Sequence, residues 1–141
     1  MKKIILVLTL MLFCSGLILG QNIQKYVNAK AYIENLGYTC KAEYSFYSLL
    51  SEGEKFYSYK TFHPGNDYII VAFSEDSDVQ DIDVYLCLTD GTIYKEDTDT
   101  ESTAVLTFSP AYEITMKTYV KNYSSDDPGY SSRCWVVIGY K

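Results

Sequence analysis

The sequence predicts a mainly β protein of the α+β class, an antiparallel β-sandwich or jelly-roll-like domain preceded by an N-terminal pair of helices. Three observations predict this fold class. Seven short apolar or alternating segments follow residue 53, with turn signals between them. Fifteen of the 141 residues are tyrosines, which suit strands with one face open to water. Before residue 53, apolar residues recur at helical spacing instead.

The first twenty residues have the order of a secretory signal peptide. Lys2 and Lys3 precede an apolar run, and small and polar residues follow it. We expect cleavage after Gly20, so that the mature chain is exported and has no membrane span. A transmembrane anchor is one alternative, but small and polar residues interrupt the apolar run. Lipidation of Cys14 is another, although Phe13 is larger than the small residue that such a site needs.

Two helices are predicted between the signal peptide and the first strand. Asn22 can cap a helix over residues 23–36, and Gly37 is a suitable stop. Thr39 can cap a second helix that closes at Gly53, although the alternation Cys40, Ala42, Tyr44, Phe46 also fits a strand. The expected organisation is therefore a signal peptide at 1–20, a helical segment at 21–53 and a sandwich at 54–141.

Seven strands are predicted after residue 53: 55–62, 68–73, 82–88, 93–94, 104–108, 112–123 and 134–140. Two turns separate strands clearly, namely His63-Pro64-Gly65-Asn66 and the hairpin Thr89-Asp90-Gly91-Thr92. In the third strand, alternation places Val84, Leu86 and Leu88 with Ile82 on one face. Asp83, Tyr85 and Cys87 share the other face.

The order of features from Gly53 onward resembles the bacterial pre-peptidase C-terminal type of β-sandwich. The residues that carry the resemblance are 68–72, 81–86, Asp90-Gly91, Asp97 or Asp99, 105–110 and the long strand over 113–120. The resemblance implies an exported bacterial protein, periplasmic or extracellular. It also implies a non-catalytic module of the kind that accompanies secreted hydrolases, with no universal set of ligand or catalytic residues. No protease domain precedes the sandwich in this chain.

The net charge argues against nucleic acid as a partner, and the cysteine content allows a disulfide. Removal of Lys2 and Lys3 with the signal peptide leaves 10 basic against 18 acidic residues. Such a chain does not suit nucleic acid, whose binding depends on lysines and arginines that neutralise phosphates. Three cysteines remain in the mature chain, and in an oxidising compartment one disulfide could form among Cys40, Cys87 and Cys134.

An acidic stretch precedes the third strand and suggests two kinds of chemistry. Asp76, Asp78, Asp81 and Asp83 could supply oxygen ligands to Ca²⁺, although their spacing is not that of an EF-hand. The alternative is a loop whose aspartates cap backbone N–H groups. Asp81 and Asp83 could also form the carboxylate pair of a small secreted hydrolase, since residues two apart lie on one strand face.

No catalytic residues are predicted, and no cofactor beyond that calcium alternative. The only histidine, His63, lies in a turn. The tyrosines are the stronger functional signal, because an exposed group on one sheet face could stack a sugar or hold a peptide. The candidates for ligand binding are Tyr57, Tyr59, Tyr85 and Tyr94, with Tyr112, Tyr119 and Tyr130 as further members. We therefore expect a protein that binds a glycan or an envelope or extracellular protein; a purely structural envelope protein is the third alternative.

Overall fold

The computed structural model describes residues 24–141, so the signal peptide expected at 1–20 and the cap Asn22 lie outside the described residues. The chain is helical over residues 24–35. The elements that follow are β1 (Thr39–Cys40), the short 3-10 helix η1 (Ala42–Tyr44), β2 (Phe46–Leu50), β3 (Lys55–Phe62), β4 (Tyr68–Ser74), β5 (Val79–Leu88), β6 (Ile93–Asp97), β7 (Thr103–Phe108), β8 (Ile114–Ser125) and β9 (Ser132–Tyr140).

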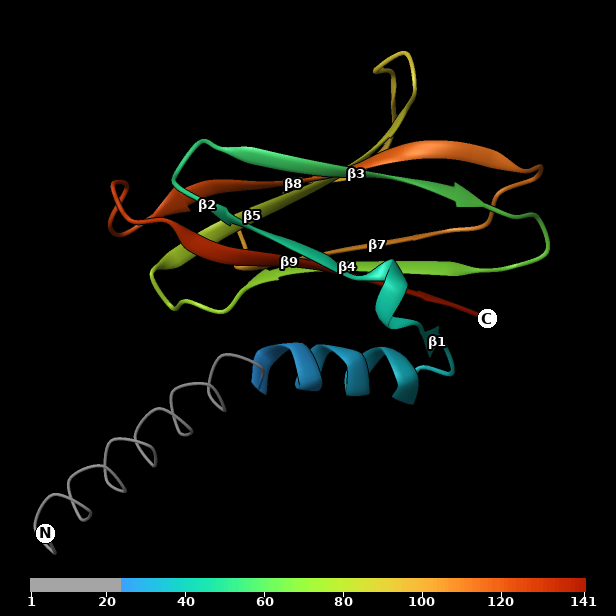
Figure 1. Cartoon of the computed structure of the whole chain (residues 1–141), viewed down its shortest axis with the longest axis horizontal. Helices are drawn as coiled ribbons and strands as arrows, with labels where there is room; N and C mark the ends of the chain where they lie inside the picture. The colour runs from blue at the N-terminus through green and yellow to red at the C-terminus, as the bar shows by residue number, and fades with distance from the viewer. Residues whose placement is uncertain (1–23) are drawn as a thin grey trace, which may run out of the picture.

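The strands form two antiparallel sheets, which confirms the β-sandwich (Figure 1). The first sheet, called sheet A, has the order β1-β9-β4-β7, and β2 also pairs with β9. The second, sheet B, has the order β3-β8-β5-β6. All seven strands predicted after residue 53 are present, β3 with the predicted bounds and the others within a few residues of them.

One hydrophobic core fills the space between the sheets. Strand alternation sends every second side chain inward, for example Ile70 of β4, Val84 of β5 and Val136 of β9, each fully buried. The prediction for β5 is confirmed, since Val84 and Leu86 are buried in this core and Leu88 packs against it.

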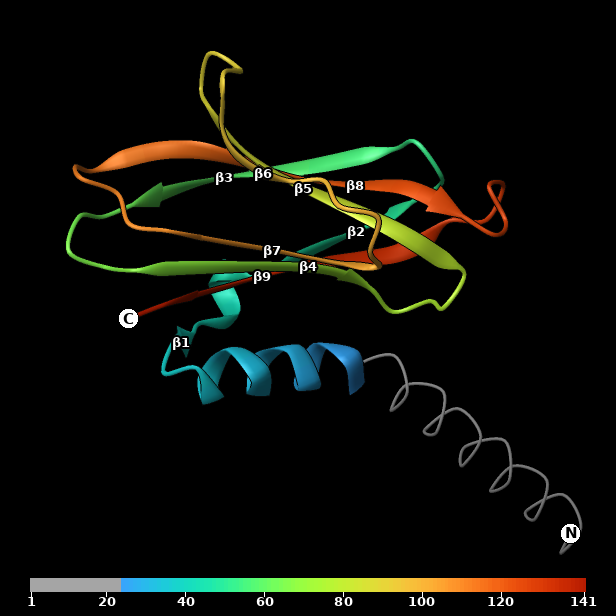
Figure 2. The same ribbon diagram turned by 180° about the vertical axis from the view of Figure 1, so that it is seen from behind.

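The helix forms a third layer on the outer face of sheet A (Figures 1 and 2). Its Ile33 is fully buried in a second apolar cluster with Val71 and Val137, and Tyr26 and Ala29 pack against this cluster. Val27 and Ala31 also fall at helical spacing in the sequence, but both side chains are exposed. The helix ends as predicted, because Gly37 adopts a φ of 85° and its N–H donates to Glu34 O.

The second predicted helix is wrong, and its residues belong to sheet A. Thr39–Cys40 and Phe46–Leu50 both pair with β9, with only the three residues of η1 helical between them. The helical spacing of Ala42, Phe46 and Leu49 was therefore misleading. The pairing decides the conformation, because β9 offers a free edge whose backbone groups bond to any extended neighbour.

The edge strands β6 and β7, which end the two sheets, lie at the back of the sandwich (Figure 2). Two side-chain hydrogen bonds join them. Asp97 of β6 accepts a hydrogen bond from Val105 N at 2.7 Å, and Lys95 donates to Thr107 O at 2.5 Å. These bonds satisfy backbone groups of the edge strand β7. Across residues 24–141, no helix combines the length and apolar character that a membrane crossing requires.

Candidate functional site

The outer face of sheet B is the open face of the sandwich. The helix covers part of the outer face of sheet A, whereas no described element lies over sheet B (Figures 1 and 2). The hairpin between β5 and β6 projects beyond the plane of sheet B on this side. Side chains that point outward from β3 and β8 are therefore available to a ligand, whereas Asp83 and Cys87 on β5 are buried.

Five tyrosines gather on this face. The register aligns Tyr57 of β3 with Tyr119 of β8, and Tyr119 in turn with Tyr85 of β5. The rings of Tyr57 and Tyr119 are 5.2 Å apart between centroids, and those of Tyr57 and Tyr59 are 5.6 Å apart. Tyr59 and Tyr123 are 52% and 55% exposed, so the group forms a surface rather than a core.

Three lysines stand among these rings. Lys117 Nζ lies 5.2 Å from the ring centroid of Tyr57 and 5.3 Å from that of Tyr59. Lys55 and Lys121 lie over Tyr119 and Tyr123 in the same way, at 5.4 and 4.2 Å. A hydrogen bond with the Tyr59 hydroxyl raises the pKa of the Lys117 amine, so the charged form of this amine is favoured. We call this set the tyrosine face: Tyr57, Tyr59, Tyr85, Tyr119, Tyr123, Lys55, Lys117 and Lys121.

The tyrosine face is acidic at its β5 side. Tyr85 OH donates to Asp83 Oδ2 at 2.9 Å, and burial together with this carboxylate raises the pKa of the phenol. Asp81 is 8% exposed, and its Oδ1 is buried without a hydrogen-bond partner. Burial, and then the charges of Asp83 and Asp99, raise the pKa of Asp81, while Lys121 acts in the opposite direction.

The structure brings together three of the four tyrosines predicted for ligand binding. Tyr94 is separate, because its ring faces Phe108 at 6.1 Å on the back edge. Tyr119, which the wider prediction included, lies at the centre of the face. Tyr112 lies in the segment between β7 and β8 and Tyr130 in the segment between β8 and β9. Tyr123 was missed, although its alternation with Tyr119 along β8 was the available signal.

The four aspartates considered as calcium ligands do not lie together. Asp76 Oδ2 accepts from Arg133 N at 3.3 Å, and Asp78 accepts from Ser132 Oγ at 3.2 Å, so both bind the start of β9. Asp81 and Asp83 project from β5 onto the outer face of sheet B. In residues 24–141, no three His, Cys, Asp or Glu side chains are grouped to hold a metal ion. β5 begins between the two pairs, and the calcium site at these aspartates stays a prediction.

The three cysteines and the histidine of residues 24–141 lie in separate parts of the sandwich. Cys40, Cys87 and Cys134 are free thiols, so the considered disulfide is not formed. Each lies in a different layer: Cys40 under the helix, Cys134 in the core between the sheets and Cys87 on the outer side of sheet B. His63 Nδ1 lies 3.0 Å from Glu113 Oε2, with both side chains exposed.

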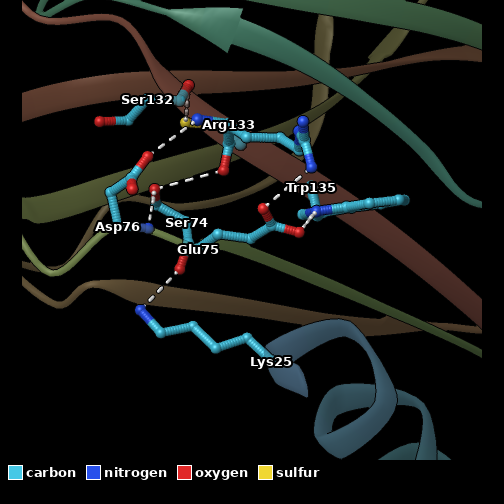
Figure 3. Close-up of polar contacts among 8 residues, drawn as sticks. Lys25, Ser74, Glu75, Asp76, Ser132, Arg133 and Trp135 are labelled. Carbon is cyan, nitrogen blue, oxygen red and sulfur yellow. Dashed lines mark hydrogen bonds and ion pairs between the residues drawn. The ribbon is translucent and has the colours of Figure 1, made fainter. Parts of the chain in front are cut away.

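A second polar cluster fixes the helix to sheet A (Figure 3). Lys25 Nζ donates to Ser74 O at 3.0 Å. The Glu75 carboxylate accepts from Arg133 Nη1 at 3.2 Å and from Trp135 Nε1 at 2.6 Å. The Trp135 ring lies 4.8 Å from that of Tyr26 on the helix. Trp135 therefore packs on the outer face of sheet A and does not belong to the tyrosine face.

No protein-family model and no curated protein sequence matches the chain. Solved structures with a similar fold include PliG of Aeromonas hydrophila, a periplasmic inhibitor of g-type lysozyme, with a TM-score of 0.50 and 6% identity over 75% of this chain and 90% of the inhibitor. The Yersinia pseudotuberculosis-derived mitogen has a TM-score of 0.50 and 14% identity over 67% of this chain and 82% of the mitogen.

The pre-peptidase C-terminal domain of a collagenase from Bacillus anthracis is also among the similar structures. Its TM-score is 0.49 and its identity 10%, over 67% of this chain and 86% of that domain. This domain belongs to the type of β-sandwich that the sequence resembles. At such identities the likeness shows the fold alone, which is a β-sandwich built of antiparallel sheets.

Proposed function

We propose that the chain is an exported, non-catalytic β-sandwich protein that binds a glycan on the tyrosine face, at the cell envelope or outside the cell. The proposal depends chiefly on one observation, the alignment of Tyr57 and Tyr119 with Lys117 over both rings. The basic, apolar and small residues of positions 1–20, in the order of a signal peptide, support export.

The chemistry of the face suits a sugar chain. The faces of exposed phenol rings pack against the C–H faces of sugar rings, while each hydroxyl remains free for a polar contact. Lysines around the rings donate hydrogen bonds to sugar hydroxyls or acidic groups. The face is part of a paired sheet, so its rings are held in place before binding, which lowers the entropy lost by the protein.

The acidic residues of β5 favour this proposal over the hydrolase alternative. Asp83 is 3% exposed and already accepts a hydrogen bond from the Tyr85 hydroxyl. A glycosidase carboxylate has to reach the glycosidic oxygen or the anomeric carbon. Carboxylates that are buried within a sheet face do not provide that access.

A glycan array probed with the labelled mature chain, starting at Gln21, tests the proposal. We expect binding to a subset of glycans, and a loss of at least about tenfold in affinity when Tyr57 is replaced by alanine. Unchanged binding by Tyr57→Ala would show that the ligand does not use this face. The absence of any bound glycan would reject the proposal.

A protein ligand is the second candidate, because tyrosines are also enriched at the centres of protein interfaces. Among the structures of similar fold is a lysozyme inhibitor, whose ligand is a protein. Inhibition of a g-type lysozyme, and binding to extracellular matrix proteins, are therefore measured beside the array. If neither glycans nor these proteins bind, a structural role in the envelope is favoured.

A further inference from the structure

The front of the sandwich, where β2 and β3 end the two sheets, contains a cavity of about 320 Å³. Its lining comes from η1, β2, β3 and β9 and includes Tyr44, Ser45, Phe46, Ser58, Lys60 and Ile138. The volume is at the lower end of the range of about 300–1,000 Å³ typical of small-molecule sites. Figure 1 shows β2 and β3 on the same side of the molecule.

Lys60 points into this cavity. Its neighbours at alternate positions of β3, Ser58 and Phe62, face the inside of the sandwich, so alternation directs Lys60 inward as well. Its Nζ lies 2.8 Å from the ring centroid of Tyr44. Within residues 24–141, no carboxylate forms an ion pair with this amine.

The charges around Lys60 leave the ammonium group incompletely compensated. Burial lowers the pKa of the amine to about 8; the carboxylate of Glu43 acts to raise it and the charge of Lys41 to lower it. An ammonium group has three N–H donors. The ring of Tyr44 interacts with the ammonium group from one side only, so the donors that point elsewhere have no partner from this ring. A partly buried amine of this kind is stabilised by an anion that reaches it.

The cavity also contains an unused hydroxyl. Ser45 Oγ is buried and has no hydrogen-bond partner. Thr118 Oγ1 is in the same condition, and Thr118 is the β8 partner of Ser58 in the register. A buried hydroxyl without a partner is destabilising, so the Ser45 hydroxyl in the same cavity as Lys60 suggests that a ligand provides an acceptor here.

We propose that this cavity, which we call the front cavity, binds a carboxylate group, with Lys60 as its counter-ion and Ser45 as a hydrogen-bond donor. A carboxylate offers two oxygens and one negative charge, which match the ammonium group and a hydroxyl. The carboxylate can belong to a free small acid or to a uronic-acid unit of a sugar chain. Tyr59 lines the cavity and also belongs to the tyrosine face, so the two sites adjoin at this residue. Only this second source depends on the proposed glycan binding.

The binding is tested with acetate, free glucuronate and a tetramer of galacturonate. The lysines are reductively methylated with ¹³C, and the Lys60 resonance is assigned with Lys60→Met. We expect a shift of this resonance on addition of at least one probe. Affinity falls about tenfold per pH unit above the pKa of about 8, because the carboxylate binds the charged amine.

Three variants separate the interpretations. Their binding of the same probes is compared with that of the natural chain by saturation-transfer difference NMR on the unmethylated proteins, because Lys60→Met and Lys60→Arg have no Lys60 resonance. Lys60→Met removes binding, whereas Lys60→Arg retains it and abolishes the dependence on pH between about 7 and 9. Lys30→Met, which removes an exposed helix lysine paired with Glu34, leaves binding unchanged. Binding of acetate and glucuronate indicates a small acid. Much tighter binding of the tetramer, lost in Tyr57→Ala, indicates a uronic-acid chain on the tyrosine face.

The proposal is overturned if the Lys60 resonance does not move with any of the three probes at about 100 mM, or if folded Lys60→Met binds as well as the natural chain. In that case Lys60 acts only as an inward-pointing charge that protects the edge strand β3. If the glycan array shows no binding, the acetate and glucuronate titrations still test carboxylate binding in the front cavity. The proposals for the tyrosine face and for the front cavity can therefore fail separately.

Discussion

Tyr57 and Tyr119 face each other across β3 and β8 with ring centroids 5.2 Å apart, and Lys117 lies within 6 Å of both centroids. Adjacent strands are about 4.8 Å apart, so residues aligned in the register hold their rings close to this separation. The pair therefore needs no special loop conformation. It follows from the pairing of two strands, of which β8 buries Met116 and Val120 in the core and β3 buries Phe62 there.

Replacement of Tyr119 by alanine removes the centre of the tyrosine face. We expect affinity for a glycan identified on the array to fall about 30-fold, equivalent to about 2 kcal/mol, because a central aromatic anchor is lost. Loss of stability should be smaller, about 1 kcal/mol, since the ring is half-exposed. Isothermal titration calorimetry and urea unfolding measure the two effects.

Tyr112→Ala is the matched control for this prediction, since Tyr112 is 67% exposed and lies outside the tyrosine face. Its affinity for the same glycan should equal that of the natural chain. An equal loss in both variants would place the ligand elsewhere.

Asp81→Asn should stabilise the protein at pH 7. The pKa of Asp81 is raised in the folded state, by burial first and then by Asp83 and Asp99. The folded-state pKa lies above the unfolded value of about 3.9, so the folded protein favours the protonated, uncharged carboxyl group. The stability that this group contributes is therefore complete at low pH and is lost as pH rises through the folded pKa. The amide keeps the shape without the charge, so its melting midpoint should exceed the natural one at pH 7 and equal it at about pH 3. A lower midpoint at pH 7 would contradict this sign.

Glu75→Ala should destabilise the contact between the helix and sheet A. Its side chain is 6% exposed and accepts from both Arg133 and Trp135, so its removal leaves two donors unpaired. We expect a loss of about 2 kcal/mol, below the value for a fully buried pair because the Arg133 side chain is 35% exposed. Urea unfolding followed by the fluorescence of the single tryptophan measures it. Glu75→Gln keeps an acceptor for Trp135 and should lose less; an equal loss would show that charge alone matters.

Gly139→Ala should displace the helix from sheet A. A Cβ atom at this position of β9 would lie 2.5 Å from Ile33 Cγ2 and 3.1 Å from Ile69 Cγ2. Overpacking of this kind costs about 1–3 kcal/mol. Amide hydrogen exchange in residues 24–35 should accelerate in the variant. Gly129→Ala is the control, because there the nearest atom is Asp127 Oδ1 at 3.6 Å.

Cys134 should be the slowest of the three thiols to react. Burial in the core raises its pKa to about 12, and the thiolate is the reactive form. Labelling with iodoacetamide at pH 8, followed by mass spectrometry, should modify the half-buried Cys40 first and Cys134 only after unfolding in urea. Rapid labelling of Cys134 in the native protein would show that the sheets open readily.

The amino-acid sequence by itself determined the strands from β3 to β9 and the end of the helix at Gly37. Each of these elements carries its own local signal, either a two-residue alternation or a glycine that adopts a positive φ. The residues of β1 and β2 carry both helical and strand periodicity, so only their pairing with β9 decided between them.

The tyrosine face and the front cavity were decided by the tertiary structure. Tyr57, Tyr119 and Tyr85 lie on three strands, and their alignment depends on a register that no single segment encodes. Lys60 and Ser45 meet at the front of the sandwich only because β2 joins sheet A while β3 joins sheet B. Local periodicity shows which face a side chain takes, but strand pairing decides which other side chains share that face.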